Sequence, residues 1–272
     1  MFRHPSTLTY YWRTVPRIPS KKQITTFRKL AQRKYREQTG LYLAEGLRSV
    51  SQILHGGRVQ IVAILSTREE TFFRLPSSQI EQYLVDSETF ISLSDTEQSQ
   101  DIIAICRVKS PGDIDLVKNK TSGVVVAVDG IQDPGNLGTI IRSATWFNCD
   151  ALLFGSGTVD YYNPKVVRST AGACEVLPHW RVQLDDVLPN WVDAGWEVCL
   201  LDVGSNAERL DLCNFSDKVL LVVGNEGNGI SESIKSHGFR RVFIHGNSNE
   251  VESLNAGVAL SLALYEVGRG SM

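Results

Sequence analysis

Two stretches in the second half of the chain contain only apolar residues, at 124–128 and 219–223, and they constrain the fold most strongly. A strand with one face in water alternates apolar and polar side chains, so a strand without alternation must be covered on both faces. Helices on the two sides of a parallel sheet provide that cover. The sequence therefore predicts an α/β fold with a mainly parallel sheet.

The spacing of apolar residues places the other elements of this half. Further strands are expected at 151–154, 196–203 and 242–244, and helices at 137–147, 164–170, about 185–194, near 230–236 and at 254–266. Residues 123–272 are thus predicted to form one domain.

The first half predicts a smaller α/β domain at 21–106. Helices are expected from Lys21 to Thr39, around 50–54 and at 77–84, and strands at 41–44, 59–65 and 101–106. Residues 1–20 are expected to be a flexible leader, and residues 107–122 a linker.

Charge is distributed unevenly along the chain, although the net charge is only −2. Residues 1–48 contain 11 Lys and Arg against two acidic residues, whereas the remainder is acidic. Such a basic segment is typical of a protein that meets a polyanion such as RNA, because phosphate neutralisation supplies most non-specific affinity. A solvated face or a targeting arm would also explain it, although Pro5, Pro16 and Pro19 interrupt the amphipathic helix of a transit peptide.

The five cysteines are odd in number and include no Cys-x-x-Cys pair, which argues against a disulfide framework and a zinc site. We expect a cytoplasmic protein without a metal. No membrane span is expected either, because Asn255, Gly257 and Ser261 interrupt the longest apolar stretch.

Three polar stretches follow predicted strands in the second half. In the first, at 129–142, Asn136 can cap the next helix, and Arg142 falls outside its apolar stripe. The second, at 224–229, has three glycines in six residues, which indicates close approach of backbone to a ligand or unusual dihedral angles. It lacks the Gly-Lys-Ser/Thr of a phosphate-binding loop and the Gly-x-Gly-x-x-Gly of a dinucleotide fold.

The third stretch, at 244–255, is a polar loop that leads into the helix at 254–266. That helix is apolar on nearly every face, so other elements or a second subunit must cover it. Ser253 and Asn255 lie where the loop becomes a helix, so their side chains can converge on one point with free backbone N–H groups. The alternative is that Ser253 only caps the helix.

Taken together, the three stretches resemble the SpoU (TrmH) family of S-adenosylmethionine-dependent RNA ribose 2'-O-methyltransferases. The resemblance rests on Asp133-Pro134-Gly135-Asn136-Leu137-Gly138-Thr139-Ile140-Ile141-Arg142, on Gly224-Asn225-Glu226-Gly227, and on Ser253-Leu254-Asn255 before the apolar helix. Arg33-Lys34-Tyr35-Arg36 and the segment 40–46 also look like a small ribosomal-protein-like RNA-binding domain. In one departure, Ile244-His245-Gly246 stands where the family has Ile-Pro-Met.

The resemblance implies a trefoil knot in the C-terminal domain, a homodimer, S-adenosylmethionine as cofactor and RNA as substrate, ribosomal RNA by family analogy. It also implies roles for individual residues. The catalytic set is Arg142, Asn136, Glu226, Ser253 and Asn255. The cofactor-binding set is Gly224, Asn225, Gly227, Ile244, Leu254, Asp202 and Val203. The substrate-binding set is Arg33, Lys34, Arg36, Arg168 and Ser169.

Other functions are weighed against this one. The chain could methylate transfer RNA, or bind RNA through its basic domain without catalysis. A dinucleotide-dependent oxidoreductase would need a glycine fingerprint in the first strand–helix turn, and residues 129–135 do not have it.

Overall fold

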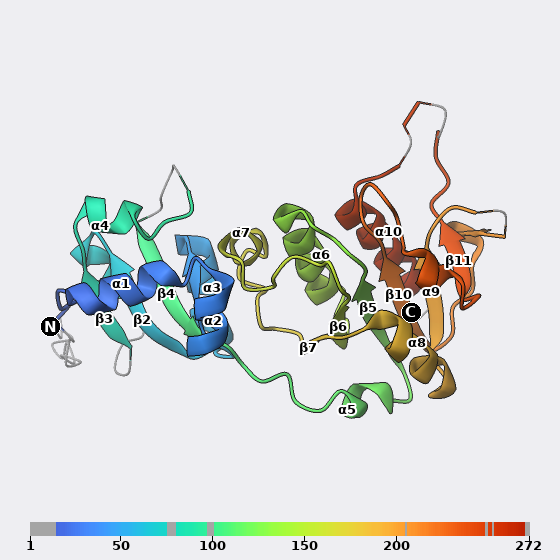
Figure 1. The fold of residues 1–272 in the computed structure, drawn as a ribbon, viewed down its shortest axis with the longest axis horizontal. Helices are drawn as coiled ribbons and strands as arrows, with labels where there is room; N and C mark the ends of the chain where they lie inside the picture. Colours follow the sequence, from blue (N-terminus) through green and yellow to red (C-terminus); the bar gives the residue numbers. More distant parts are fainter. Residues whose placement is uncertain are drawn as a thin grey trace, which may run out of the picture. The chain divides into compact units, whose positions relative to one another are not determined.

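The computed structural model describes residues 15–74, 80–96, 101–204, 206–247, 250–251 and 253–269. The chain forms two compact units, Met1–Arg107 and Val108–Met272 (Figure 1). The predicted leader lies mostly outside the described residues.

The first unit is built on a four-stranded sheet in the order β1-β4-β2-β3. Its strands are β1 (Leu41–Glu45), β2 (Ile61–Ser66), β3 (Glu81–Leu84) and β4 (Ile102–Arg107). Strand β4 runs antiparallel to both neighbours, and β2 and β3 are parallel. Its helices are α1 (Lys21–Lys29), α2 (Arg33–Thr39), α3 (Leu47–Gly56), α4 (Ser87–Ile91) and the 3-10 helix η1 (Glu69–Arg74).

The helix predicted from Lys21 to Thr39 is in fact two helices, α1 and α2. Gln32 takes an extended conformation between them, and Leu30 is fully buried in the core. Arg36 Nη1 donates to the carbonyls of Leu30 and Ala31 at 2.7 and 2.8 Å. These bonds satisfy two carbonyls that the end of α1 leaves without helical partners.

The helix predicted at 77–84 is wrong for the described residues, because 81–84 form β3. Residues 75–79 lie outside the described part of the chain. Gln82 and Tyr83 are both buried, and β3 pairs with residues 63–66 of β2. The short run of apolar residues here does not distinguish a buried strand from a helix, and pairing with a partner distant in sequence decides it.

The second unit contains a seven-stranded sheet in the order β7-β6-β5-β10-β8-β11-β9, and every neighbouring pair is parallel. This confirms the α/β class and the predicted strands in this half. The strands are β5 (Gly123–Val128), β6 (Ala151–Phe154), β7 (His179–Arg181), β8 (Glu197–Leu201), β9 (Glu208–Arg209), β10 (Lys218–Val223) and β11 (Arg240–Phe243). The short edge strands β7 and β9 were not expected from the sequence.

Helices cover both faces of this sheet, as the uninterrupted apolar strands require. The helices are α5 (Asp115–Lys118), α6 (Pro134–Trp146), α7 (Pro164–Ser169), α8 (Leu184–Asp193), α9 (Glu232–Lys235), α10 (Ala256–Arg269) and the 3-10 helix η2 (Leu210–Leu212). One core cluster joins Val125 and Ala127 of β5 to α5, α8 and α9. Helix α5 falls within the segment expected to be a linker, and its Val117 belongs to this core.

Helix α6 packs against both α7 and α10. At Gly257 of α10, an added Cβ would lie 2.8 Å from Thr139 Cγ2, so this glycine permits close contact with α6. One turn further on, the hydroxyls of Ser143 and Ser261 are 2.7 Å apart. Helix α10 therefore contacts α6 along two successive turns.

The strand order reverses direction between β5 and β10. From β5 the chain continues outward to β6 and β7, whereas β8, β11 and β9 lie on the other side of β10. In open parallel sheets, ligands bind beyond the carboxyl ends of the strands at such a reversal. The loops after β5 and β10 are the first and second polar stretches of the sequence.

Candidate active site

Three of the predicted catalytic residues form a chain of hydrogen bonds across three elements. Asn255 Nδ2 donates to Asn136 Oδ1 at 2.7 Å, and Asn136 Nδ2 donates to Glu226 Oε1 at 2.5 Å. Asn136 lies in the first turn of α6, Glu226 in the loop after β10, and Asn255 directly before α10. The fold thus brings together residues separated by 90 and 119 positions in sequence.

Asn136 is free to make these contacts because another residue caps α6. Asp133 Oδ1 accepts from the Asn136 N–H at 2.8 Å, and Pro134 follows as the first helical residue. The predicted capping role of Asn136 is therefore wrong. Asn255 both caps a helix and contacts Asn136. Its Oδ1 accepts from the backbone N–H groups of Gly257 and Val258 at the start of α10, and its Nδ2 donates to Asn136.

The loop after β10 folds back on itself in a tight turn. Asn225 and Gly229 exchange both backbone hydrogen bonds at 2.9 Å. An added Cβ at Gly224 would lie 2.3 Å from the carbonyl carbon of Gly229, a separation that real Cβ atoms do not show. Gly224 is required by this close backbone approach.

Asn225 uses its side chain to hold the turn. Its Oδ1 accepts from the N–H groups of Gly227 and Asn228, and its Nδ2 donates to the carbonyl of Gly130 at 2.8 Å. Asp129 Oδ2 likewise accepts from the Ser231 N–H at 2.7 Å. These bonds tie the loop after β5 to the loop after β10, and they give Asn225 a structural role.

The remaining residues predicted to bind the cofactor lie beyond three neighbouring strands. The order β10-β8-β11 places Gly224, Asp202 and Ile244 at the carboxyl ends of adjacent strands, because all three run parallel. Nearby loop positions expose apolar side chains, with Val203 74% and Leu254 48% exposed. Apolar side chains open to solvent beside strand ends are the lining that a nucleoside base would cover.

This edge of the sheet has two features of a ligand site. At Gly224 the backbone of Gly229 comes so close that residue 224 cannot carry a side chain. Asp202 Oδ2 is buried without a hydrogen-bond partner among the described residues, which indicates a polar group intended for a ligand.

Arg142 lies on α6, six residues beyond Asn136, which corresponds to about 9 Å along a helix axis. It is exposed, and within the described residues it makes no hydrogen bond or ion pair. Ser253 is also exposed, two residues before Asn255. The structure therefore joins Asn136, Glu226 and Asn255 directly and leaves Arg142 and Ser253 outside that set of bonds.

Family comparison agrees with this arrangement. Residues 123–265 match the model of the SpoU rRNA Methylase family, and residues 21–104 match the MRM3-like substrate binding domain. The chain belongs to the SpoU rRNA methylase family.

Two similar proteins of known name share most of their length with this SpoU protein. The 23S rRNA (guanosine(2553)-2'-O)-methyltransferase RlmP of Bacillus subtilis is 30% identical over 251 residues, covering 90% of this chain and 96% of RlmP. The 23S rRNA (uridine(2479)-2'-O)-methyltransferase of Streptomyces viridochromogenes is 28% identical, covering 88% and 86%. The two names share the ribose 2'-O position and differ in the base.

Solved structures show the same fold. A putative RNA methyltransferase of the TrmH family from Porphyromonas gingivalis aligns with a TM-score of 0.79 and 27% identity, covering 93% of this chain and 99% of that one. The SpoU methyltransferase AviRb from Streptomyces viridochromogenes, solved in complex with AdoMet, aligns with a TM-score of 0.80 and 24% identity over 93% of this chain and 98% of that one.

The predicted substrate-binding residues of the SpoU domain lie on α7. Asn163 caps this helix by accepting from the Lys165 N–H at 2.9 Å, and Pro164 begins it. Arg168 is partly exposed, and Ser169 Oγ donates to the carbonyl of Lys165. An added Cβ at Gly138 would lie 2.3 Å from Ser169 Cβ, so Ser169 faces α6. Ser169 therefore contributes to helix packing.

In the first unit, Arg36 does not fit the role predicted for it. It is only 4% exposed, and its guanidinium donates to backbone carbonyls inside the domain. Arg33 and Lys34 are exposed. Other exposed cations on α1 extend the basic surface, namely Lys21, Lys22, Arg28 and Lys29.

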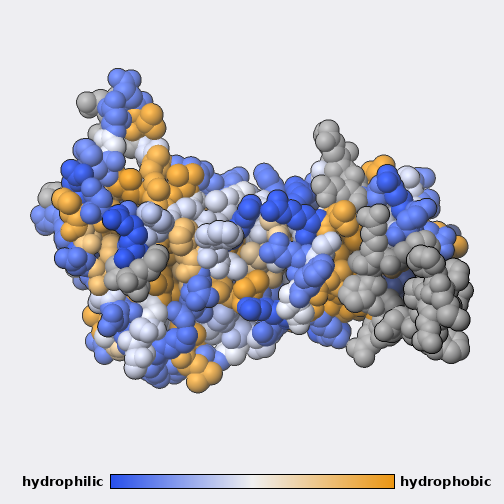
Figure 2. Space-filling model, turned by 180° about the vertical axis from the view of Figure 1, so that it is seen from behind, coloured by the Kyte–Doolittle hydropathy of each residue, from blue (hydrophilic) through white to orange (hydrophobic). Residues whose placement is uncertain are grey.

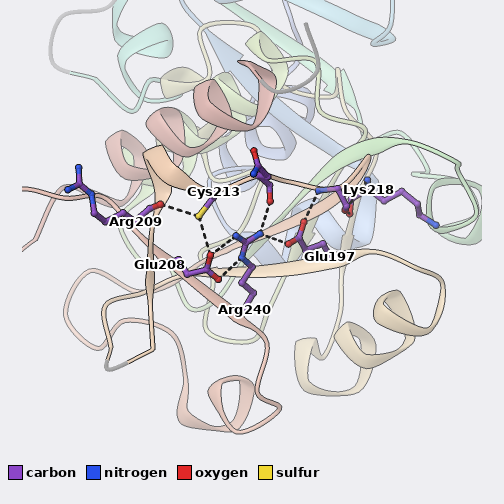
Figure 3. Close-up of polar contacts among 8 residues, drawn as sticks. Glu197, Glu208, Arg209, Cys213, Lys218 and Arg240 are labelled. Atoms are coloured by element: carbon purple, nitrogen blue, oxygen red, sulfur yellow. Dashed lines mark hydrogen bonds and ion pairs between the residues drawn. The ribbon is translucent and has the colours of Figure 1, made fainter.

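Sequence reasoning missed an arginine that holds the outer strands of the SpoU domain. Arg240 of β11 bonds Glu197 of β8 at 2.6 Å and Glu208 of β9 at 2.8 and 3.0 Å (Figure 3). The bonds to Glu208 raise the pKa of Arg240 further and lower that of Glu208. Because Asp202 and Val203 lie between β8 and β9, this ion pair fixes both ends of their loop. Arginine at a strand start gives no sequence signal for such a role.

A second unpredicted cluster lies where α7 returns to β7. His179 stacks on Tyr161 with ring centroids 3.8 Å apart, and its Nε2 is 3.3 Å from Tyr162 Oη. Tyr162 Oη donates to Glu175 Oε1, which also accepts from the Lys109 N–H at 3.2 Å. Burial lowers the pKa of His179 to about 4 and raises the pKa of Glu175. This cluster supports the segment that carries Arg168 and Ser169.

Proposed function

We propose that this protein transfers a methyl group from S-adenosylmethionine to a ribose 2'-hydroxyl of ribosomal RNA. The observation that carries the proposal is the hydrogen-bonded chain of Asn255, Asn136 and Glu226 beside the Gly224 turn. It supports a polar substrate site next to a nucleoside-binding edge, in a chain of the SpoU family.

The chemistry requires that a hydroxyl, a poor nucleophile while protonated, be aligned and relieved of its proton. The cofactor supplies the electrophilic methyl group. Arg142 stabilises the negative charge that develops on the ribose oxygen, and a phosphate or water takes the proton. Arginine is an unsuitable base, because its guanidinium keeps its proton in proteins.

Asn136, Glu226 and Asn255 hold the ribose in place. Each contributes through a fixed geometry, since their mutual bonds restrict their rotamers. Arg142 is exposed on α6, so RNA can reach its guanidinium without a change in the fold. Ser253 adds a further hydroxyl at the entry to α10.

The test uses methyl-labelled S-adenosylmethionine and ribosomal RNA from cells that lack this protein. The wild type should label RNA, and digestion should release a 2'-O-methyl nucleoside. Arg142→Ala should bind cofactor and RNA normally and lose most of the transfer rate. Full methyl transfer by Arg142→Ala would remove Arg142 from the mechanism, and label on a base would refute the reaction.

Ribosomal RNA is favoured over transfer RNA because both named relatives act on 23S rRNA. The basic surface of the first unit, with Arg33 and Lys34, provides phosphate contacts. The bases named in the two relatives differ, so the base is set by features that vary within the family.

We also propose a homodimer that forms through α10. The sequence suggested a helix apolar on nearly every face, and the structure buries one side while exposing Val258, Leu262 and Tyr265 at 46%, 42% and 53%. Their spacing puts them on one face of the helix. Figure 2 shows hydrophobic surface in the region of α10. A second copy would cover this stripe, as the family resemblance implies.

The remaining proposals concern the path and location of the chain. We propose the trefoil knot that the SpoU fold implies, and the domain limits 21–106 and 123–272, with residues 107–122 between them and α5 of this segment packed on the second domain. A cytoplasmic location is supported by five free cysteines, four of them buried. No helix among the described residues is long and apolar enough to cross a membrane.

A further inference from the structure

Asp202 stands out among the charged groups of the SpoU domain, because its Oδ2 atom is buried without a hydrogen-bond partner in the described part of the chain. Its side chain is 12% exposed, and its carboxylate makes no hydrogen bond with any described residue. Two cations lie near Oδ2, Lys235 Nζ at 3.7 Å and Arg241 Nη1 at 3.9 Å. Both distances exceed the range of a direct hydrogen bond, about 2.7 to 3.2 Å.

The position of Asp202 in the fold explains why its carboxylate has no hydrogen-bond partner among the described residues. Asp202 follows β8, which lies between β10 and β11 in the sheet, and its Oδ1 lies 4.0 Å from where a Cβ on Gly229 would be. The carboxylate is thus beside the Gly224–Gly229 turn, where backbone leaves room for a ligand. A buried acceptor without a donor costs free energy, so it is retained where a ligand supplies the donor.

The charges around Asp202 indicate which donor it takes. Glu232 also pairs with Lys235, at 3.1 Å, so the two carboxylates and the two cations balance, and the ammonium group of the cofactor's amino-acid part would add an uncompensated positive charge. A neutral hydroxyl has no such penalty. Carboxylates beyond strand ends in α/β folds bind ribose hydroxyls in this way.

We propose that Asp202 binds a ribose hydroxyl of the S-adenosylmethionine cofactor, with Lys235 and Arg241 holding its carboxylate in place. The inference rests on the proposed function, since it assigns a contact within the same cofactor site. Arg240 contributes indirectly, because its bonds to Glu197 and Glu208 fix the strands on both sides of the Asp202 loop.

The test measures binding by calorimetry, without RNA. Asp202→Asn should weaken S-adenosylmethionine binding by roughly 10- to 100-fold, as expected for a lost charge-assisted bond. The same factor should be lost for 5'-methylthioadenosine, which has the ribose and base but lacks the amino acid. Asp193→Asn, which changes an exposed aspartate at the end of α8, should bind like the wild type.

A second pair of probes identifies the donor. The 2'-deoxy and 3'-deoxy forms of 5'-methylthioadenosine should bind the wild type more weakly than 5'-methylthioadenosine does. For the form that lacks the hydroxyl bound by Asp202, wild type and Asp202→Asn should bind with equal affinity. If Asp202→Asn weakens the binding of both deoxy forms by the same factor as it weakens the binding of 5'-methylthioadenosine, neither hydroxyl is the donor. That result would assign the contact to the base and overturn the proposal. A penalty for S-adenosylmethionine alone would assign it to the amino acid, with the same consequence.

Asp202→Glu guards against misreading a folding defect, because it keeps the charge between Lys235 and Arg241 and displaces the oxygens by one methylene. Its melting temperature should match the wild type while its affinity falls. Wild-type protein that binds no S-adenosylmethionine would refute the proposed function itself. Wild-type binding with unchanged affinity in both variants would refute only the role of Asp202.

Discussion

Acidification should destabilise the SpoU domain through His179. This ring stacks on Tyr161 and lies near Phe154 and Tyr162, and burial lowers its pKa from 6.5 to about 4. Between these values the unfolded chain binds a proton that the folded protein does not. Stability is therefore complete above pH 6.5 and is lost as the pH falls toward 4.

The size of the effect follows from the shift. The difference between the two pKa values of His179 corresponds to a loss of about 3 kcal/mol in the free energy of unfolding at a pH well below 4. About 2 kcal/mol of this is already lost at pH 5. Glu175 acts in the opposite direction, because burial raises its pKa and the folded state gains a proton first. A comparison of variants is needed to isolate the histidine.

Urea unfolding at pH 7 and pH 5, followed by tryptophan fluorescence, provides the measurement. Four of the five tryptophans, at 146, 180, 191 and 196, lie in the second unit, so the signal reports this domain. His179→Phe keeps an aromatic ring and removes the titratable group. Between pH 7 and pH 5 its free energy of unfolding should therefore fall by about 2 kcal/mol less than that of the wild type. His55→Gln, at an exposed histidine, should behave like the wild type. Equal losses in the wild type and His179→Phe would refute the reasoning.

Three further predictions concern the cofactor loop, the RNA and the dimer. Gly224→Ala should reduce S-adenosylmethionine affinity more than tenfold in calorimetry, because its Cβ would lie 2.3 Å from Gly229, whereas Gly268→Ala meets nothing within 4 Å and should have no effect. Replacing Lys29, Arg33 and Lys34 with Ala should lower the salt slope of RNA binding by about 2 without changing cofactor affinity, and an unaltered slope would mean that these cations do not contact phosphate. Leu262→Glu should yield a monomer in sedimentation at micromolar concentration, while Ile91→Glu, at an exposed site in the first unit, should not; a wild-type monomer with full activity would contradict the dimer.

The strand pattern of the second unit could be predicted because its apolar runs are long and uninterrupted. Residues 124–128 and 219–223 became parts of β5 and β10, at the centre of the sheet. The contact of Asn136, Glu226 and Asn255 was foreseen only as a family resemblance, since nothing local in the sequence specifies pairing across 90 or 119 residues.

Other features depend on contacts that a sequence does not display. Arg36 looks like its exposed basic neighbours, yet its guanidinium binds carbonyls that the break between α1 and α2 leaves free. Asn136 and Asp133 are both good capping residues, and only the helix start at Pro134 decides between them. The two-residue strand β9 pairs with β11, and Arg240 of β11 also bonds its Glu208, a contact that only the folded sheet creates.

The two outermost strands of the large sheet also affect how copies of the protein can associate. Strand β7 has three residues and β9 has two, so each border of the sheet offers few unpaired N–H and C=O groups. Trp180 of β7 also donates its indole N–H to the carbonyl of Gly112. This bond holds the segment before α5 beside the β7 edge of the sheet. Short and occupied borders resist the edge-to-edge strand pairing that leads to aggregation. The two borders therefore keep the sheets of neighbouring molecules from joining.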